Sequence, residues 1–148
     1  MIDHTEELEE FTPYLMNRIM ARYNKGVEAA LKEVGVSVAQ MRALVVLAEG
    51  GPCTITELSV LTVIKQSTLS RTLDTMEAAG LLQREARDGD NRFRQISLTD
   101  AGLAAFEAAW PAMLGMRDTM LNSLSEDERG TLKRLLLKVF YDIRHHDF

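Results

Sequence analysis

The chain has 148 residues, of which 46% are apolar and 26% charged. This length suits one compact domain or one small module fused to a dimerisation region, and excludes two large independent domains. The composition excludes a disordered chain. Its apolar runs are short and interrupted by charge, which excludes the run of roughly 18 apolar residues that a membrane span needs. The net charge of -5 is uneven: residues 65–94 carry six basic and five acidic side chains, whereas both flanking segments are acidic, so a small basic face for a polyanionic partner remains workable.

The first seven residues are acidic and lack the positive and apolar regions of a secretory signal, so we expect a cytoplasmic protein.

Thr12 is a candidate N-cap before Pro13, which predicts a long helix that ends at Gly35. Apolar side chains recur along it every four residues: Leu15, Ile19, Tyr23, Val27 and Leu31. At about 1.5 Å per residue this helix is roughly 30 Å long, more than one small module needs, so we expect a partner chain to cover the surplus.

Two capping boxes organise the next part of the chain. Residues 37–40, Ser-Val-Ala-Gln, open a helix that ends at the Gly-Gly-Pro of 50–52, and residues 54–57, Thr-Ile-Thr-Glu, open a short helix. A further helix runs from about Gln66 to Ala79. A short helix, a tight connection and a second helix form the helix-turn-helix pattern.

A β-hairpin is predicted next, because residues 81–84 and 93–98 flank the turn-forming Asp-Gly-Asp-Asn of 88–91. A helical stretch then starts after Thr99, and we expect Pro111 to kink or split it. The capping box of residues 125–128 opens the last helix.

The sequence therefore predicts a mainly α-helical fold with a small β-hairpin wing (α+β). Residues 37–99 would form a winged helix-turn-helix module, and residues 1–36 and 100–148 a helical dimerisation region with long terminal helices. The last helix has an apolar stripe of its own at heptad-like spacing. The residues expected at the dimer interface are Leu15, Leu132, Leu135, Leu136, Val139 and Phe140.

The helix from Gln66 has one apolar side and one polar side. Short polar and arginine side chains near the N-terminal end of a helix can reach base edges and phosphates in the major groove. Glutamine can pair with adenine, and arginine can hold guanine or a phosphate. The candidate DNA-binding residues of this helix are Gln66, Ser67, Thr68, Ser70 and Arg71; alone, they fit an ordinary solvated helix face equally well.

Three arginines, Arg87, Arg92 and Arg94, cluster around the predicted hairpin turn. A basic wing tip can enter the narrow, electronegative minor groove. We expect Asp90 to orient Arg92 through a charge-assisted pair. A solvated hairpin with incidental arginines is the alternative, and the order of helix and wing favours DNA.

Residues 58–102 resemble the MarR family of bacterial regulators. The resemblance rests on Ser-Thr-Leu-Ser-Arg at 67–71, Glu-Ala-Ala-Gly-Leu-Leu at 77–82, Asp-Asn-Arg at 90–92 and Leu-Thr-Asp-Ala-Gly at 98–102. In that family an Asp-x-Arg element of the wing lies shortly before a Leu-Thr pair, as Asp90, Arg92, Leu98 and Thr99 do here. The family often repeats this element just upstream, whereas this chain has Arg-Asp-Gly at 87–89.

The resemblance implies a homodimer whose first and last helices interdigitate, a palindromic double-stranded operator near a promoter, and repression relieved by a small-molecule effector. It also places an effector pocket between the dimerisation helices and the winged module. The candidate lining residues are Tyr14, Met16, Met20, Tyr23 and Met113, although ordinary core or interface packing of these methionines is the favoured alternative.

Other reactive residues give weaker signals. Cys53, the one cysteine, excludes a disulfide framework, and we expect a packed loop residue rather than a redox-active thiol. His145 and His146 are adjacent, so their side chains point apart and do not form a metal chelate. We therefore expect no cofactor and no metal.

Three functions compete at this point. A ligand-responsive transcription regulator accounts for the arginines on both helix and wing. A winged helix used for protein contacts would leave these arginines merely on the surface. An enzyme is disfavoured, because the sequence has no Gly-rich phosphate loop, metal-ligand cluster or Cys-His constellation in a persuasive context.

Overall fold

The computed structural model describes residues 4–87 and 90–144, of which residues 4–6, 87 and 90–93 are described by their backbone alone. The elements follow in the order α1 (His4–Glu9), α2 (Thr12–Glu33), α3 (Val38–Gly50), α4 (Ile55–Thr62), α5 (Gln66–Ala78), β1 (Leu82–Arg87), β2 (Asp90–Leu98), α6 (Asp100–Met120) and α7 (Glu126–Ile143). The predicted fold class is confirmed: the described chain is mainly helical and carries a two-stranded antiparallel hairpin.

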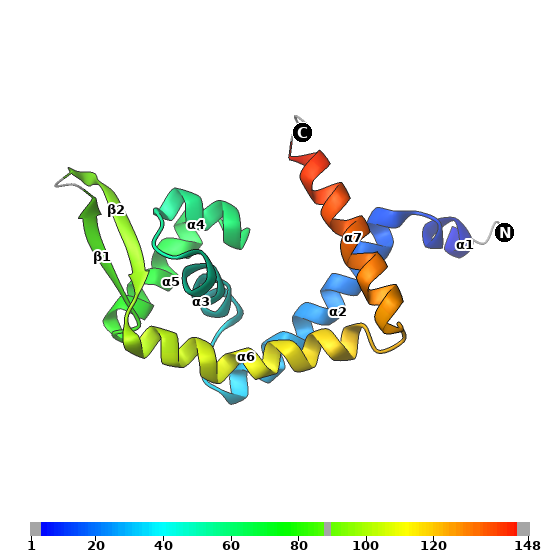
Figure 1. Ribbon diagram of the computed structural model, residues 1–148, viewed down its shortest axis with the longest axis horizontal. Coiled ribbons are helices and arrows are strands. Elements are labelled where there is room, and N and C mark those ends of the chain that lie inside the picture. Colours follow the sequence, from blue (N-terminus) through cyan, green and yellow to red (C-terminus); the bar gives the residue numbers. More distant parts are fainter. Residues whose placement is uncertain (1–3, 88–89, 145–148) are drawn as a thin grey trace.

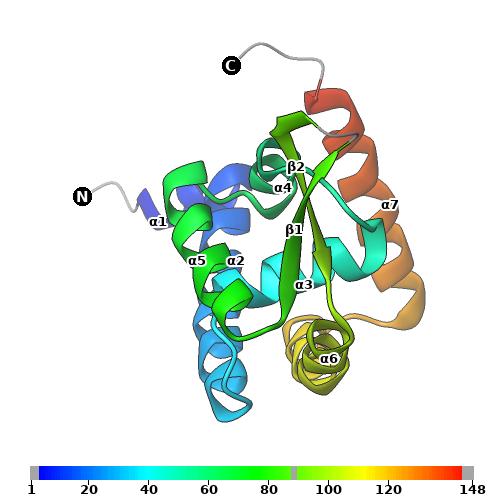
Figure 2. The same ribbon diagram turned by 90° about the vertical axis from the view of Figure 1, so that its left-hand side faces the viewer.

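The elements form a winged module at one end and a helical arm at the other (Figure 1). The module contains α3, α4, α5 and the hairpin, whereas α1 and α7 lie at the far end. The two ends are joined by α2 and α6, which pack against each other. Seen from the module's end, α5 and the hairpin lie side by side (Figure 2), so the two elements predicted to contact DNA are neighbours.

The predicted helix starts are confirmed at three capping boxes. The side chains of Ser37, Thr54 and Ser125 each accept a hydrogen bond from the backbone amide three residues on. The Gln or Glu side chain at that third position accepts one from the amide of the N-cap residue. At the first long helix the prediction is wrong by one residue, because Phe11 is the N-cap and Thr12 is already helical. This cap has no side-chain hydrogen bond, and Pro13 in the first turn needs none.

Pro111 does not split α6, which runs unbroken from Asp100 to Met120. A proline inside a helix costs about 3 kcal/mol because a hydrogen bond is lost. Tertiary packing offsets this cost: Phe106 and Ala109, on the preceding turn, are buried in the core, and α6 contacts α2, α3 and β2. The helix therefore carries one continuous connection from the module to the arm.

One apolar core holds the winged module together. Leu69, Leu73 and Met76 of α5 are fully buried in it. The rest of the core comes from the other elements of the module and from α2 and α6: Val27, Leu31, Met41, Ala43, Leu44, Leu47, Cys53, Leu58, Leu82, Ile96, Phe106 and Ala109. Each fully buried large side chain stabilises the fold by roughly 1.5–3 kcal/mol, so packing fixes the direction in which α5 presents its other face.

The arm is different, because α7, all of whose residues are described, buries none of them within the chain. Leu135, Leu136, Val139 and Phe140 are between 44% and 56% exposed, and Leu15 of α2 is 38% exposed. Leu132 is half-buried. A contiguous apolar patch that is exposed on a protein surface marks an interaction site.

A crowded joint connects the end of α5, the start of the hairpin and the first turn of α6. The Thr99 hydroxyl donates to the Gly80 carbonyl at 2.6 Å and accepts from the Gly102 amide at 3.1 Å. The Thr99 amide also donates to the Leu81 carbonyl at 3.1 Å. A Cβ on Gly102 would overlap the carbonyl oxygen of Leu81, so glycine is required there by the close approach of two backbones.

Replacing Gly102 with alanine should lower the free energy of unfolding by about 1–3 kcal/mol, because the new methyl group forces the joint apart. The midpoint of urea unfolding measures this change. Gly50→Ala is the matched control, since a Cβ there meets nothing within 4 Å, and its effect should stay within about 0.5 kcal/mol. Equal midpoints for the two variants would contradict the role given to the joint.

Candidate nucleic-acid interface

The face of α5 opposite the core is polar and exposed. Gln66, Ser67, Thr68 and Arg71 are exposed, and Ser70 is half-buried. These are the five residues that the sequence assigned to DNA on this helix, and the structure places them in its first two turns, outside the buried stripe of Leu69, Leu73 and Met76. Their short side chains leave room for a groove to approach the helix.

The turn between α4 and α5 is held by three contacts. The Ser59 hydroxyl donates to the Ile64 carbonyl at 2.7 Å, and the Ile64 amide donates to the Ser59 carbonyl at 3.2 Å. Arg42 of α3 reaches the Thr62 carbonyl at 3.5 Å. Val63 between them has φ of 56°, in the left-handed region that a β-branched residue rarely adopts. The turn therefore has a defined geometry that sets the angle between the two helices.

Thr56 was not predicted as part of the site. Its hydroxyl oxygen accepts a hydrogen bond from Nε2 of Gln66 at 3.2 Å, which ties the first turn of α4 to the first residue of α5. Both side chains are exposed. No periodicity or motif links residues ten positions apart across a turn, so only the packed structure shows this pair.

Arg84 of β1 is a second residue that the sequence did not single out. Its Nη2 donates to Asp74 at 2.8 Å, and its Nε lies 3.1 Å from Glu77 without the alignment of a hydrogen bond. The side chain of Arg84 is 19% exposed, whereas those of Asp74 and Glu77 are 66% and 47% exposed. Arg84 thus joins the hairpin to α5 and offsets two negative charges on the helix predicted to face DNA.

The hairpin carries the predicted wing. Its strands pair from Leu82 opposite Leu98 to Ala86 opposite Arg94, and the register shifts between Ala86 and Arg87. Arg94 is exposed. The side chains of Arg87, Asp90 and Arg92 lie outside the described residues, so the pairing of Asp90 with Arg92 stays a prediction.

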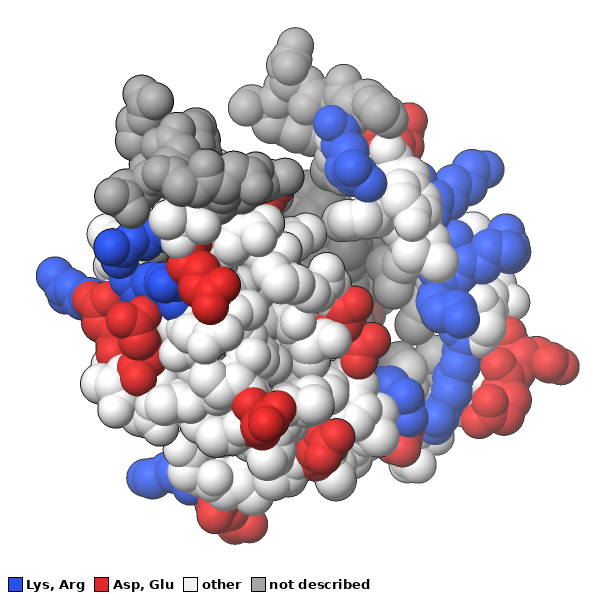
Figure 3. Space-filling model, turned by 60° about the vertical axis from the view of Figure 1, so that its left-hand side comes forward, with Lys and Arg blue, Asp and Glu red and all other residues white. Residues whose placement is uncertain are grey.

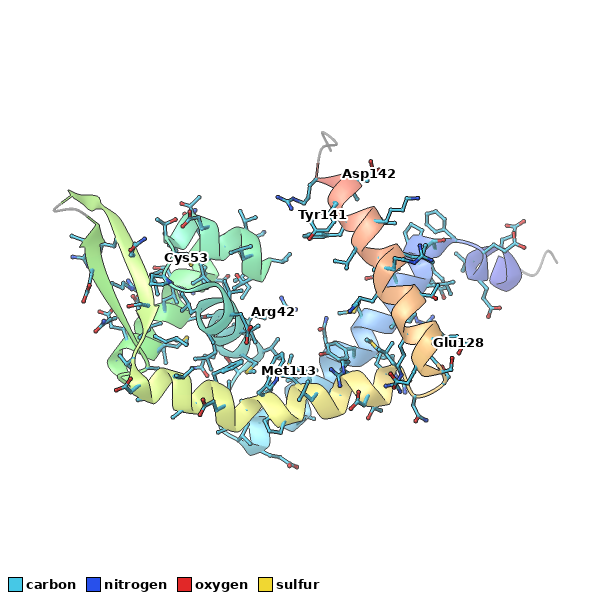
Figure 4. All side chains as sticks on the ribbon, in the orientation of Figure 1. Arg42, Cys53, Met113, Glu128, Tyr141 and Asp142 are labelled. Atoms are coloured by element: carbon cyan, nitrogen blue, oxygen red, sulfur yellow. The ribbon has the colours of Figure 1, made fainter. Side chains whose placement is uncertain are left out.

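Cys53 helps to place the hairpin against α4. Its backbone pairs with Ile96 of β2 through hydrogen bonds of 3.2 and 2.8 Å, and its side chain is buried inside the module (Figure 4). Burial raises the pKa of the thiol, and the nearby Glu57 raises this pKa further. The prediction of a packed residue is confirmed, and a raised pKa disfavours the reactive thiolate.

Over the winged module, acidic and basic side chains are mixed, and a gap separates the module from a band of Lys and Arg (Figure 3).

An open hollow of about 790 Å³ lies between α2 and α6. It is lined by Arg18, Ile19, Arg22, Tyr23, Lys25, Gly26, Met116, Thr119 and Met120. The lining is therefore apolar with a cationic rim.

Among the five residues predicted for an effector pocket, Tyr23 lines this hollow. Burial raises the pKa of Tyr23, and the positive charge of Arg117 acts in the opposite direction. Tyr14 accepts a hydrogen bond from Arg18 at 2.7 Å instead. Met16 and Met20 are 44% and 43% exposed, and Met113 packs on the core from the middle of α6 (Figure 4). The sequence missed Arg18, Arg22 and Lys25.

A second groove, of about 860 Å³, lies between α6 and α7. Three of the predicted dimer residues, Leu132, Leu136 and Phe140, line it together with Met120 and Leu137. An apolar groove on an otherwise unpacked helix is suited to a helix of another chain.

Other features add little chemistry. The part of the chain that the structure describes contains no group of three His, Cys, Asp or Glu side chains that could hold a metal ion, and His145 and His146 lie outside it. Among the described residues, no helix combines the length and the apolar character that crossing a membrane requires.

Comparison with known proteins gives a consistent result. A protein-family model described as MarR family matches residues 34–92. The chain is 28% identical over 135 residues to the HTH-type transcriptional repressor IacR of Pseudomonas putida. The aligned region covers 91% of this chain and 81% of that relative. A MarR-family transcriptional regulator from Silicibacter pomeroyi is 40% identical, and its crystal structure covers 95% of both chains with a TM-score of 0.84.

One further solved structure is similar in fold. BpsR of Bordetella bronchiseptica, whose DNA binding is regulated by 6-hydroxynicotinic acid, superposes with a TM-score of 0.79 over 88% of this chain and 98% of its own. At 24% identity this likeness concerns the fold alone.

Proposed function

The chain belongs to the MarR family of winged helix-turn-helix transcription regulators, and we propose that it binds a palindromic operator as a homodimer and represses a nearby promoter until a small effector binds. The family consists of transcription regulators, so the chain is not an enzyme. The observation that carries the proposal is the exposed polar face of α5 beside the hairpin. That arrangement suits a helix in the major groove with a wing over the adjacent minor groove.

Charge supports the same surface. Arg71 and Arg94 are exposed on α5 and β2, and Lys65 is exposed at the start of α5. Arg84 holds Asp74 and Glu77, which lowers the local repulsion of a phosphate backbone. A face of this kind can bind DNA on an acidic chain because screening by salt makes the contacts local.

The apolar arm supports a homodimer. α7 buries no residue within the chain, and its exposed leucines and Phe140 continue into the groove between α6 and α7. A second copy supplies the same apolar stripe on its own α7 and α2, so a two-fold interface covers both at once. Two winged modules held in this way would match the two half-sites of a palindrome.

The hollow between α2 and α6 supports an anionic effector. Arg18, Arg22 and Lys25 can hold an acidic group, while Ile19 and Met120 contact an apolar body. α6 leads from the hollow directly to the joint at Thr99, so a ligand that favours one direction of α6 also favours one spacing of the recognition helices.

The first test is binding to DNA upstream of the protein's own gene, with an unrelated fragment as competitor. Arg71→Ala and Arg92→Ala should each lower the affinity for the specific fragment about tenfold and lessen its salt dependence by about one counterion, because each removes a contact to base or phosphate. Lys32→Ala, at the far end of α2, is the charge-matched control. Unchanged affinity in both arginine variants would favour a winged helix used for protein contacts.

The dimer is tested on α7. Replacing Leu135 and Leu136 together with aspartate should weaken dimerisation at least a hundredfold, because dimerisation would then remove two charged carboxylates from water. The melting temperature should fall as well. Sedimentation over a range of protein concentrations measures the dissociation. Removal of residues 1–11 should have a smaller effect. A double variant that stays dimeric at every concentration would exclude this interface.

The effector hollow is tested with aromatic carboxylates, 6-hydroxynicotinic acid among them, each paired with its neutral amide. At least one carboxylate should lower DNA affinity about tenfold. Arg22→Gln should weaken that response without changing DNA binding in the absence of the carboxylate, since Arg22 lies on α2 and belongs neither to α5 nor to the hairpin. Equal responses to acids and amides, or a full response in Arg22→Gln, would contradict the assignment.

A further inference from the structure

The hydrogen bond between Thr56 and Gln66 joins the N-terminal turns of the two helices of the helix-turn-helix. Gln66 Nε2 donates to Thr56 Oγ1 at 3.2 Å, and both side chains are exposed on the surface that carries the candidate DNA residues. Among the described polar residues on the exposed face of α5, Ser67, Thr68, Ser70 and Arg71 have no side-chain hydrogen bond to another helix. Gln66 is therefore the residue of this set whose orientation is fixed before DNA arrives.

Both ends of this contact are anchored. On the α4 side, the Thr54 amide donates to Glu57 at 2.8 Å and the Glu57 amide donates to Thr54 at 3.3 Å, which fixes the first turn of the helix. On the α5 side, Leu69 is fully buried one turn after Gln66. Because the two turns are already anchored, the contact has to order only the side chains of Thr56 and Gln66 and not their backbones.

The chemistry of a primary amide determines what is left for a base. The Gln66 amide has two N–H donors and one carbonyl acceptor. One N–H is used by Thr56, and Oε1 has no donor partner among the described residues. Of the two N–H groups of a primary amide, one lies on the same edge as Oε1 and the other points away from it. The proposal requires that Thr56 accept from the second, which leaves the first N–H and Oε1 together on one edge. That edge matches adenine in the major groove, where N7 accepts and the N6 amino group donates.

We propose that Thr56 is a positioning residue that turns the amide edge of Gln66 toward an adenine in each half-site. The inference rests on the proposed function as a DNA-binding regulator and names the base that one residue of the interface reads. Thr56 acts through Gln66, because its oxygen accepts from the amide and thereby selects which edge of the amide faces outward.

Thr56 has a second capacity in the same position. Since its oxygen accepts from Gln66, its own hydroxyl hydrogen is left to donate, and no acceptor for it occurs among the described residues. The first helix of a helix-turn-helix crosses the DNA backbone, so a phosphate oxygen is the acceptor that fits. A phosphate that holds Thr56 would then also hold Gln66, which couples backbone contact to base reading.

The test uses the full-length protein and a pool of random double-stranded oligonucleotides. The wild-type protein and the Gln66→Ala variant are each used to select a consensus sequence from the pool. Gln66 reads the position at which the wild type selects adenine but the variant does not. Duplexes with adenine or 7-deazaadenine at that position are then compared, because 7-deazaadenine lacks the N7 acceptor while keeping the N6 amino group.

Wild type should bind the 7-deazaadenine duplex about tenfold more weakly than the adenine duplex. Thr56→Val keeps the shape but loses the hydroxyl, and should reduce this difference to threefold or less. Thr56→Ser restores the hydroxyl and should restore the tenfold difference. Thr75→Val is the matched control, since the Thr75 hydroxyl donates to the Arg71 carbonyl within the same helix, and it should keep the full difference.

Two results would overturn the inference while leaving the proposed function standing. One is a Gln66→Ala protein that selects the wild-type consensus, and the other is a Thr56→Val protein that keeps the tenfold difference. If wild type selects no consensus at all, the proposed function fails and the inference fails with it. Thermal melting of Thr56→Val, an exposed position, should match wild type within about 2 °C.

Discussion

The close approach of Gly102 to the carbonyl of Leu81 is the contact on which the rest of the molecule depends. It brings the first turn of α6 against the segment that ends α5 and begins the hairpin, and the Thr99 hydroxyl bonds to both sides of it. These contacts connect α5, the hairpin and α6 at one point. In the proposed mechanism, a change in the direction of α6 at the arm would be transmitted through this point to the candidate DNA surface, because packed elements shift as units rather than bend.

The distribution of apolar surface is the physical basis of the proposed homodimer. The winged module has a closed core around α5, whereas α7 leaves Leu135, Leu136 and Phe140 partly in water. In the proposed dimer, a module with a closed core and an arm with an exposed apolar face would allow the spacing of the two modules to vary while each module stays intact. The effector proposal needs this division, since a ligand at α2 and α6 must alter the arm without melting the module.

How far the sequence could predict the structure depends on the range of the interaction. The capping boxes at Ser37, Thr54 and Ser125 depend on four consecutive residues, and the buried face of α5 on helical periodicity, so both were predicted correctly. The contacts of Arg84 with Asp74 and of Thr56 with Gln66 depend on how a strand or a helix packs across a turn. No local pattern encodes that angle, and the cationic rim of the hollow was missed for the same reason.

Pro111 and the wing show two further limits. Proline predicts a break from its local chemistry, but the packing of Phe106 and Ala109 keeps α6 continuous. The arginine cluster of the wing was predicted from the positions of three arginines around the expected hairpin turn, and of its members Arg94 has a described side chain, which is exposed. In both cases the sequence identifies the residue that matters, while tertiary contacts decide what that residue does.

The acidic net charge of the chain separates affinity from specificity at this surface. A chain of net charge -5 gains no general attraction to DNA, so phosphate contacts must come from a few local cations such as Arg71. Those contacts carry little sequence information and weaken with salt. Neutral groups held in place by the fold can add specificity to what the arginines read, because their hydrogen bonds depend on orientation rather than on charge. In our proposal Gln66, held by Thr56, is such a group, and it lies at the junction of α4 and α5.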